Sequence, residues 1–288
     1  MKKQKTYIHF AHPCLINPTN PIKVILIGAG GTGSHMLTAL AKTNHALTSL
    51  GHAGLQVELW DDDRVSNANI GRQLFADAEV GLYKAVALIN RSNRFFGTNW
   101  KAINKKFSYS ELENTSEGMV SIYISCVDTV AARFEIAELL PLLKKTAVII
   151  WPPLYWMDTG NAKFTGQTLL STIGDLKQPP SKKYHSVRQL PMVTEEYTDQ
   201  LKTQADNDEL SCSLAEALAK QDLFINPAIA DLSASLLWQL FREGMTENRG
   251  FFLNIKDLRA QPIKVAPILP MVQPLSKQNR RKRLAKAA

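Results

Sequence analysis

Residues 22–34 read IKVILIGAGGTGS, and this stretch decides the fold. Its first part, Ile22 to Ile27, is almost entirely apolar, as expected for a strand that is buried on both faces of a parallel sheet. A glycine-rich turn follows directly, and a helix is predicted from about Ser34. A buried strand, a glycine turn and a helix in this order predict a Rossmann-like α/β unit.

The glycine turn predicts a phosphate-binding site. It fits the pattern GxGxxG, and its glycines are Gly28, Gly30, Gly31 and Gly33. Glycines allow a tight turn and let backbone N–H groups approach a phosphate, while the start of the following helix favours negative charge. The alternative is a turn that only packs the helix against the strand.

Outward from this unit the chain alternates between strands and helices. The predicted strands are 55–60, 120–127 and 146–151, and the predicted helices are 79–90 and 129–145. An antiparallel hairpin (157–173), a long polar crossover connection (174–211), helices broken near Asn226 and Pro227 (214–243) and an extended stretch (254–274) follow. The expected fold class is α/β, a mixed sheet flanked by helices, whose Rossmann-like parallel half continues into an antiparallel half.

The composition is that of an ordinary globular protein. Of the 288 residues, 45% are apolar and 21% are charged, which excludes disordered and fibrous classes. We expect an N-terminal segment (1–21), one large domain (22–274) and a basic tail (275–288). Three widely spaced cysteines exclude a four-cysteine zinc site and favour a cytoplasmic setting. No apolar run approaches the ~20 residues of a membrane span, so no membrane partner is expected.

The net charge of +8 is concentrated in the tail. Six basic residues lie between Lys277 and Lys286, where there is no acidic residue. The plain interpretation is a solvated terminus, and the alternative is a weak contact with nucleic acid. No aromatic residues interleave with these charges, so recognition by base stacking has no support.

Acidic residues follow two of the predicted strands. Asp61, Asp62 and Asp63 end the strand at 55–60, where a carboxylate can accept hydrogen bonds from ribose hydroxyls. A solvated loop would explain one or two of them. Asp128 follows the strand at 120–127, and it would either hold Mg²⁺ against phosphates or, like Thr129, cap the next helix.

The segment after the aspartates separates this chain from a dehydrogenase. It contains Asn69, Arg72 and Gln73, and Lys84 follows at the next predicted helix. Arg72 is suited to clamp phosphate oxygens, the two amides to supply uncharged hydrogen bonds, and Lys84 to supply a point charge. Taken alone, Lys84 is more often a solvated lysine.

The cysteines are expected to differ in reactivity. Cys212 lies between the polar connection and a predicted helix, and a helix N-terminus can lower the pKa of a thiol. Cys212 is therefore a candidate nucleophile, with an incidental cysteine as the alternative. Cys126 lies in an apolar strand and is expected to be inert. Cys14 lies in a loop with no supporting group evident in the sequence. His9 and His12 are three positions apart in a loop and show no metal-ligand pattern.

Four motifs resemble one superfamily, the ubiquitin-activating-enzyme-like adenylyltransferases (ThiF, MoeB and HesA). They are VILIGAGGTGS (24–34), WDDDRVSNANIGRQ (60–73), EVGLYKA (79–85) and ISCVDTVAARF (124–134). The resemblance covers roughly residues 22–173. NIGRQLF (69–75) and SCSLAEALAKQDLFIN (211–226) resemble more closely the ThiF-type proteins of the PRTRC gene system.

This resemblance implies an enzyme that uses ATP and Mg²⁺ to adenylylate the C-terminal carboxylate of a small ubiquitin-like or sulfur-carrier-like protein. Family members commonly work as homodimers. Many carry two CxxC pairs and an arginine before the first strand, and this chain has neither. The implied residues are Gly28, Gly30, Gly31 and Gly33 in the ATP loop, Asp61 on ribose, Asp63 beside the nucleotide, Asn69, Arg72, Gln73 and Lys84 on the triphosphate, Asp128 on Mg²⁺, and Cys212 as a thioester-forming acceptor.

Two other functions stay open from the sequence. A nicotinamide-dependent oxidoreductase would explain GxGxxG and Asp61, but it would not explain Arg72, Lys84 or the two amides. A non-catalytic accessory protein of a mobile genetic element would keep the ATP fold and contact nucleic acid through its basic tail.

Overall fold

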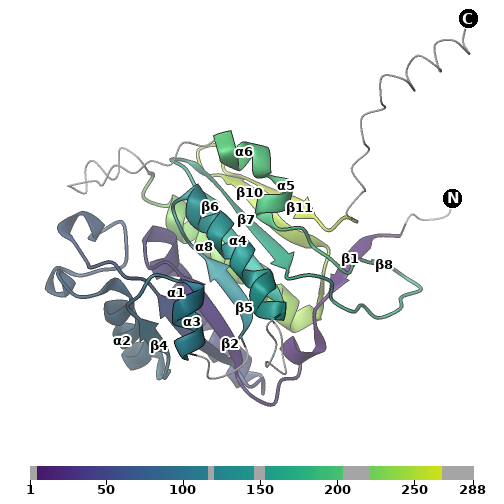
Figure 1. Ribbon diagram of the computed structural model, residues 1–288, viewed down its shortest axis with the longest axis horizontal. Coiled ribbons are helices and arrows are strands. Elements are labelled where there is room, and N and C mark those ends of the chain that lie inside the picture. The colour runs from purple at the N-terminus through teal and green to yellow at the C-terminus, as the bar shows by residue number, and fades with distance from the viewer. Residues whose placement is uncertain (1–4, 116–119, 146–152, 204–220, 268–288) are drawn as a thin grey trace, which may run out of the picture.

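The computed structural model describes residues 5–115, 120–145, 153–203 and 221–267. Its centre is an eight-stranded sheet in the order β11-β10-β7-β6-β5-β2-β3-β4 (Figure 1). Strands β4, β3, β2, β5 and β6 are parallel, and β7, β10 and β11 continue the sheet antiparallel. This confirms the predicted α/β fold class, in which a parallel half continues into an antiparallel half. The strands are β2 (Ile22–Ile27), β3 (Leu55–Trp60), β4 (Lys101–Ile103), β5 (Val120–Ser125), β6 (Tyr155–Asn161), β7 (Thr165–Thr172), β10 (Asn248–Asn254) and β11 (Arg259–Lys264).

Helices cover both faces of this sheet. One core cluster joins Val24 and Leu26 of β2 to α1, α2 and α8, and a second joins Ile25 and Ile27 to α4. Successive side chains of a strand point to opposite faces, so β2 contributes to both clusters. Figure 1 shows α4 in front of the sheet and α8 behind it. The helices are α1 (Gly31–Ser49), α2 (Lys84–Phe96), α3 (Tyr109–Thr115), α4 (Val130–Lys145), α5 (Val193–Glu196), α6 (Thr198–Thr203) and α8 (Ile225–Glu243).

The described part of the N-terminal segment packs onto the domain. Strand β1 (Tyr7–Phe10) lies between β8 (His185–Ser186) and β9 (Met245–Thr246) in a small three-stranded sheet. The following 3₁₀ helix, Pro13–Leu15, buries Leu15 completely. Two further 3₁₀ helices, Asn67–Asn69 and Asp77–Glu79, lie between β3 and α2.

The predicted start of the helix at 79–90 is wrong, because the observed helix α2 begins at Lys84. Gly81 has a φ of +87°, a left-handed conformation that glycine adopts readily, so the chain turns after Asp77–Glu79. Helix α2 therefore begins at Lys84, whose N–H donates to the carbonyl of Asp63 at 2.9 Å. The turn thus brings Lys84 next to the aspartates that follow β3.

Other boundaries differ less from the prediction. The strand predicted at 146–151 lies outside the described residues, and β6, which begins at Tyr155, joins the two halves of the sheet. Strands β4 and β10 and helix α3 were not predicted. Helix α8 begins at Ile225, so Pro227 lies in its first turn, where its missing N–H has no intrahelical partner to lose. The predicted break near Asn226 is therefore the start of a helix.

Among the described residues, no helix combines the length and apolar character that a membrane crossing requires.

Candidate functional site

In the glycine turn between β2 and α1, three glycines pack against other parts of the chain and one, Gly30, borders free space. A Cβ at Gly28 would lie 2.7 Å from the carbonyl oxygen of Cys126, and one at Gly33 would lie 1.9 Å from that of Gly28. A Cβ at Gly31 would lie 2.6 Å from the side chain of Asn226. At Gly30, in contrast, a Cβ would meet no described atom within 4 Å. Packing within the chain therefore explains three glycines, and Gly30 borders free space at the start of α1.

The start of α1 suits an anion. No side chain of the described residues caps it at Gly30, so the N–H groups of its first turn have no side-chain acceptor. Such N–H groups, together with the helix dipole, bind phosphate well. Open space at Gly30 thus lies beside N–H groups that suit a phosphate, and phosphate binding by this turn stays a prediction.

Asp61 connects the end of β3 to the glycine turn. Its Oδ2 accepts a hydrogen bond from the N–H of Ala29 at 2.6 Å, and its Oδ1 accepts one from the N–H of Asp63 at 3.0 Å. Burial raises the pKa of Asp61, while the bond from Ala29 and the charge of Lys84 lower it in part. Each carboxylate oxygen offers two acceptor sites, so Asp61 keeps capacity for a ribose hydroxyl.

Lys84 is a buried lysine, and the alternative of a solvated side chain is wrong. Its side chain is 9% exposed, and Nζ lies 2.7 Å from Oδ2 of Asp63, whose side chain is 67% exposed. The ammonium group is thus held at the mouth of the site by a carboxylate that water still reaches. A phosphate that entered the site could share or replace this partner.

Arg72, in the loop after β3, lies close enough to Asp128, which follows β5, for their charges to interact. Burial lowers the pKa of Arg72, and the Asp128 carboxylate raises it in part. The guanidinium donates from Nη1 to Oε1 of Gln221 at 2.7 Å, while Nε is buried and has no partner among the described residues. Arginine stays charged in proteins, so a partly satisfied guanidinium here favours an anionic ligand.

Asp128 does not cap helix α4. The cap is Thr129, whose Oγ1 accepts a hydrogen bond from the N–H of Ala132 at 3.2 Å. Asp128 is exposed, and no hydrogen bond to its carboxylate is seen within the described parts of the chain. The carboxylate is therefore available to a ligand at the C-terminal edge of β5.

Asn69 and Gln73 occupy the same segment as Arg72 but have different surroundings. Oδ1 of Asn69 accepts hydrogen bonds from the N–H of Ser66 at 2.8 Å and from its Oγ at 3.1 Å. These hydrogen bonds fix the conformation of the loop from Ser66 to Asn69 and occupy the amide oxygen of Asn69. Gln73 is buried, and its Oε1 has no partner among the described residues. A buried amide without a partner is costly, which marks Gln73 as a candidate ligand-binding group.

A chain of amide side chains connects Arg72 to the start of α1, and the sequence did not reveal it. Gln221 accepts from Arg72 and donates from Nε2 to Oδ1 of Asn161 at 3.0 Å. Asn161 donates to Oδ1 of Asn226 at 2.6 Å, and Thr32 donates to the same oxygen at 3.0 Å. The arginine segment, β6, α8 and the glycine-turn helix thus meet in one network. Asn161 ends β6, a position that strand-end reasoning could have found.

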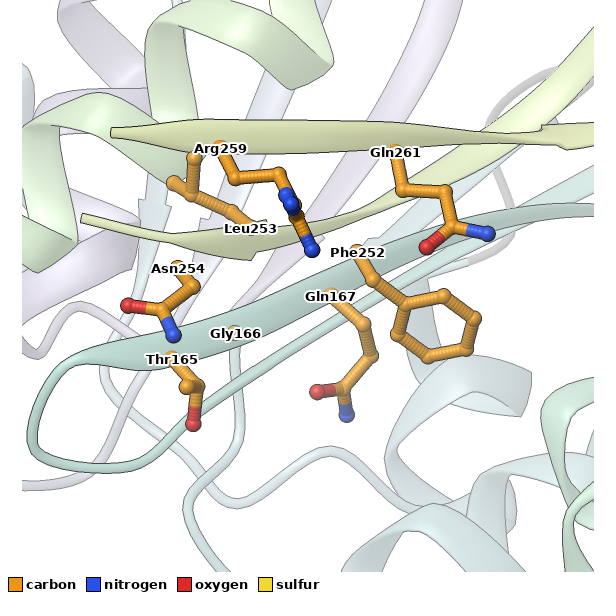
Figure 2. A pocket seen from close by; sticks show the side chains of 8 residues that line it. All are labelled: Thr165, Gly166, Gln167, Phe252, Leu253, Asn254, Arg259 and Gln261. Atoms are coloured by element: carbon orange, nitrogen blue, oxygen red, sulfur yellow. The ribbon is translucent and has the colours of Figure 1, made fainter. Parts of the chain in front are cut away.

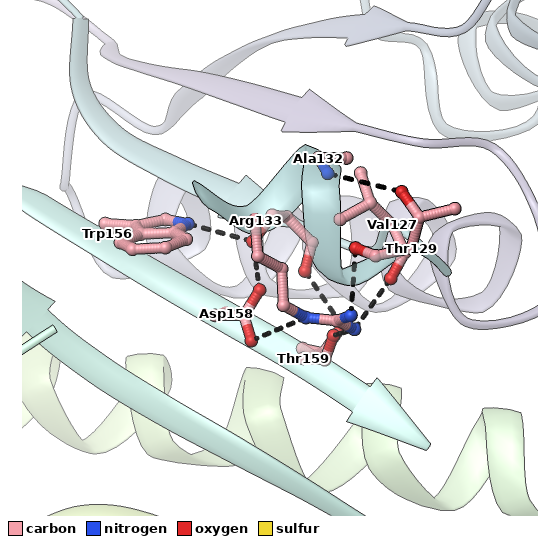
Figure 3. Close-up of polar contacts among 8 residues, drawn as sticks. Val127, Thr129, Ala132, Arg133, Trp156, Asp158 and Thr159 are labelled. Carbon is pink, nitrogen blue, oxygen red and sulfur yellow. Dashed lines mark hydrogen bonds and ion pairs between the residues drawn. The ribbon is translucent and has the colours of Figure 1, made fainter. Parts of the chain in front are cut away.

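A buried ion pair supports the backbone around Asp128 (Figure 3). Arg133 donates from Nε to Oδ2 of Asp158 at 3.2 Å, and both residues are at most 5% exposed. The same guanidinium donates to the carbonyls of Val127 at 2.7 Å and Thr129 at 3.2 Å. These two carbonyls flank Asp128, so Arg133 fixes the loop that presents it.

A groove of about 290 Å³ lies over the antiparallel half of the sheet (Figure 2). Residues of β7, β10 and β11 line it, and one of them, Thr165, is close in sequence to Asn161 at the end of β6. Gln167, Phe252 and Arg259 are among its lining residues, and their side chains are prominent in Figure 2. The groove combines an aromatic ring, amides and a cation.

The described residues contain no group of three or more histidine, cysteine or acidic side chains that could hold a metal ion. A divalent ion would therefore need ligands from a substrate in addition to Asp128. Cys212 lies outside the described residues.

One family model and several solved structures are similar to this chain. The model of the ThiF family matches residues 19–271. No curated protein sequence matches the chain. Among solved structures, PaaA is similar with a TM-score of 0.55 and 15% identity over 85% of this chain and 64% of its own. Escherichia coli MccB, solved with ATP, is similar with a TM-score of 0.54 and 15% identity over 88% of this chain and 67% of its own.

A further structure of E. coli MccB, with AMPCPP and MccA, has a TM-score of 0.55 and 15% identity over 88% of this chain and 66% of its own. At these identities the similarity concerns the fold. The chain spans about two thirds of the length of these proteins.

Proposed function

Because the chain belongs to the ThiF family, we propose that it is an adenylyltransferase, which activates the C-terminal carboxylate of a small protein with ATP. The observation that carries this proposal is that two anion-binding elements and one exposed carboxylate lie near the carboxyl-terminal ends of the parallel strands. The uncapped start of α1 and the partly satisfied Arg72 are suited to phosphates, and Asp128, whose charge acts on Arg72, is suited to a metal ion. A nicotinamide-dependent oxidoreductase with Asp61 on its ribose would not explain Arg72 together with the buried Lys84.

The roles proposed for the residues follow from their geometry. The open space at Gly30 would admit a phosphate to the N–H groups of α1, and Asp61 would accept a ribose hydroxyl. Arg72, Lys84, Gln73 and the amide nitrogen of Asn69 would hold the remaining phosphates. MccB, solved with ATP, supports this choice of nucleotide.

Asp128 is the residue that we propose for Mg²⁺. It is exposed, it leaves the helix cap to Thr129, and it lies near Arg72. Mg²⁺ is commonly held by one or two carboxylates together with substrate phosphates, which suits a site with a single available carboxylate. When bound, the ion would neutralise charge on the triphosphate.

The proposed reaction needs little covalent chemistry from the protein. A carboxylate oxygen of the partner attacks the α-phosphorus of ATP, the bond between the α-phosphorus and the bridging oxygen to the β-phosphate breaks, and pyrophosphate leaves. The products are an acyl-adenylate and pyrophosphate. Charge builds up on the phosphoryl oxygens during attack, so the fixed N–H groups and the Arg72 and Lys84 cations would stabilise the transition state.

We propose a small ubiquitin-like or sulfur-carrier-like protein as the partner, and a homodimer as the working form. MccB has been solved together with MccA, whose methionine is selenomethionine, and this supports a polypeptide partner. The groove over β7, β10 and β11 offers an extended tail both apolar and hydrogen-bonding contacts. Cys212 is proposed to accept the activated acyl group as a thioester.

ATP–pyrophosphate exchange tests the proposal. Labelled pyrophosphate should enter ATP only when the enzyme, Mg²⁺ and a small protein with a flexible glycine-containing tail are all present. Arg72→Ala and Asp128→Asn should each abolish exchange while the fold, followed by circular dichroism, is retained. Binding of a nicotinamide cofactor without ATP binding would instead favour an oxidoreductase, and full biological activity of both variants would favour a non-catalytic accessory protein.

The thioester has a test of its own. A covalent conjugate of the partner should form on the wild-type enzyme, should be released by added thiol, and should be absent from Cys212→Ala, whose exchange activity is retained. A conjugate that resists thiol, or none on the wild type, would remove this role from Cys212.

A further inference from the structure

A second group of reactive side chains lies far from the proposed ATP site. Cys14 and His12, on the 3₁₀ turn after β1, lie beside Tyr155, the first residue of β6. Asn161 of the ATP site is the last residue of the same strand. At about 3.3 Å per residue, the two ends of β6 are roughly 20 Å apart. An event at Cys14 therefore does not involve the proposed adenylation.

The imidazole of His12 is positioned to take the proton of the Cys14 thiol. Nδ1 of His12 lies 3.0 Å from Sγ of Cys14 and accepts a hydrogen bond from the N–H of Cys14 at 3.4 Å. A backbone N–H can only donate, so Nδ1 acts as an acceptor and carries no proton. The thiol thus faces a nitrogen that can act as a base, which the sequence reading of Cys14 missed.

The neighbours of His12 hold it in place. The N–H of His12 donates to the hydroxyl oxygen of Tyr155 at 3.0 Å, and that hydroxyl lies 3.0 Å from Nε2 of His9. Nδ1 of His9 donates to the carbonyl of Val187 at 2.7 Å, which leaves Nε2 to accept from the tyrosine. Three elements, β1, β6 and the segment after β8, therefore fix the geometry of the pair.

The surroundings of His12 keep its imidazole neutral, so that Nδ1 is able to accept a proton. Burial lowers the pKa of His12, and the positive charge of Lys144 on α4 lowers it further. Burial also lowers the pKa of Lys144, and the charge of Asp175 raises it in part. Reactive cysteines are found in electropositive, partly exposed places. Cys14 is partly exposed.

We propose that Cys14 and His12 form a nucleophilic thiol–imidazole pair, which is modified by small anionic disulfides through thiol–disulfide exchange. His12 takes the proton from Sγ, the sulfur attacks one sulfur of the disulfide, and the disulfide bond breaks. A mixed disulfide forms on Cys14, and the departing thiolate receives the proton. The disulfide is the only co-reactant. It supplies the oxidation of the Cys14 sulfur, because its departing sulfur is reduced to a thiol. Lys144 and the transient imidazolium suit an anionic reagent.

Cys126 is an internal reference with a buried thiol. Burial raises the pKa of this thiol to about 12, so it should react slowly. The comparison with Cys126 therefore tests the reactivity of Cys14, and a substitution of His12 tests the role of the base. A second control is His12→Asn, because asparagine keeps a side-chain acceptor at this helix cap but removes the base.

The test treats the full-length protein with oxidised glutathione and assigns the adducts by peptide mapping, which also separates Cys212. We expect Cys14 to be modified at least tenfold faster than Cys126. An ordinary thiol is only a few per cent thiolate at pH 7, so a neighbouring base speeds its reaction. A more acidic thiol has more thiolate but a weaker nucleophile, which limits the gain. His12→Asn should therefore slow the reaction at Cys14 by about threefold at pH 7. At pH 9, where thiolate forms without a base, the two proteins should react alike.

ATP–pyrophosphate exchange by Cys14→Ser and His12→Asn should stay at the wild-type level, so failure of the proposed function leaves this test intact. Equal modification of Cys14 and Cys126 would overturn the proposal. So would an unchanged rate at pH 7 in a His12→Asn protein whose thermal unfolding matches that of the wild type.

Discussion

Replacing Arg133 by methionine should destabilise the protein strongly, and more at neutral than at acidic pH. Arg133 is 5% exposed and is the ion-pair partner of Asp158, which is 1% exposed. Methionine fills much of the same volume but leaves a buried carboxylate without its counter-ion. Loss of one partner from a buried ion pair costs about 3–5 kcal/mol. The carbonyls of Val127, Thr129 and Thr159 also lose a donor.

The pH dependence follows from the sign of the shift at Asp158. Burial raises the pKa of this carboxyl group, and Arg133 and Ser125 lower it in part. Without Arg133 the pKa rises further, so the folded state of the variant binds a proton more tightly than the unfolded state does. Its stability then falls as pH rises through the interval between the two pKa values. The destabilisation should therefore be smaller at pH 5 than at pH 7.

Urea unfolding, followed by circular dichroism at both pH values, measures these effects. The double variant Arg133→Met/Asp158→Asn removes both charges and should recover part of the loss at pH 7. A loss below about 1 kcal/mol for Arg133→Met, equal at pH 5 and pH 7, would refute the reasoning, because a solvated or already neutral Asp158 would behave in this way.

Three further predictions concern the site itself. Gly33→Ala should fail to fold or lose several kcal/mol, because its Cβ would meet the carbonyl oxygen of Gly28, and thermal unfolding measures this loss. Gly30→Ala should fold normally but bind ATP at least tenfold more weakly, as measured by calorimetry. Lys84→Met should change the free energy of unfolding by no more than about 1 kcal/mol, because its ion-pair partner Asp63 is exposed. The same substitution should weaken ATP binding tenfold or more. An unchanged affinity for ATP would exclude Lys84 from the site. Asn226→Ala removes an amide that is 1% exposed and should cost about 1–3 kcal/mol, measured by urea unfolding, and a cost near zero would show that the amide network contributes no stability.

The fold was largely predictable because its signals are local. The apolar run at Ile22–Ile27 with its glycine turn defines a buried strand and a helix start without help from the rest of the chain. The start of α2 was not predictable in the same way. Val80 and Tyr83 continue the helical periodicity, but Gly81 interrupts the helix, and the bond from Lys84 to Asp63 joins residues 21 positions apart.

The residues of the candidate site also differ in whether short sequence motifs or long-range contacts define them. Asp61, Arg72 and Lys84 belong to short motifs that can be read directly. Thr32, Asn161, Gln221 and Asn226 do not, because their network joins positions up to 194 residues apart and depends on how α8 docks against α1. His12 and Cys14 are close in sequence, yet the turn that brings Nδ1 to Sγ is fixed by Tyr155, 143 residues away from His12.

The central claim is that the glycine turn, Arg72 and Asp128 form one site for ATP with Mg²⁺. Isothermal calorimetry of ATP binding, with and without Mg²⁺, tests it most directly on the wild type, Arg72→Ala and Asp128→Asn. We expect Mg²⁺ to strengthen binding to the wild type, Arg72→Ala to weaken it at least tenfold, and Asp128→Asn to lose the effect of the metal. ATP binding that ignores both substitutions and the metal, or no ATP binding by the wild type, would contradict the claim.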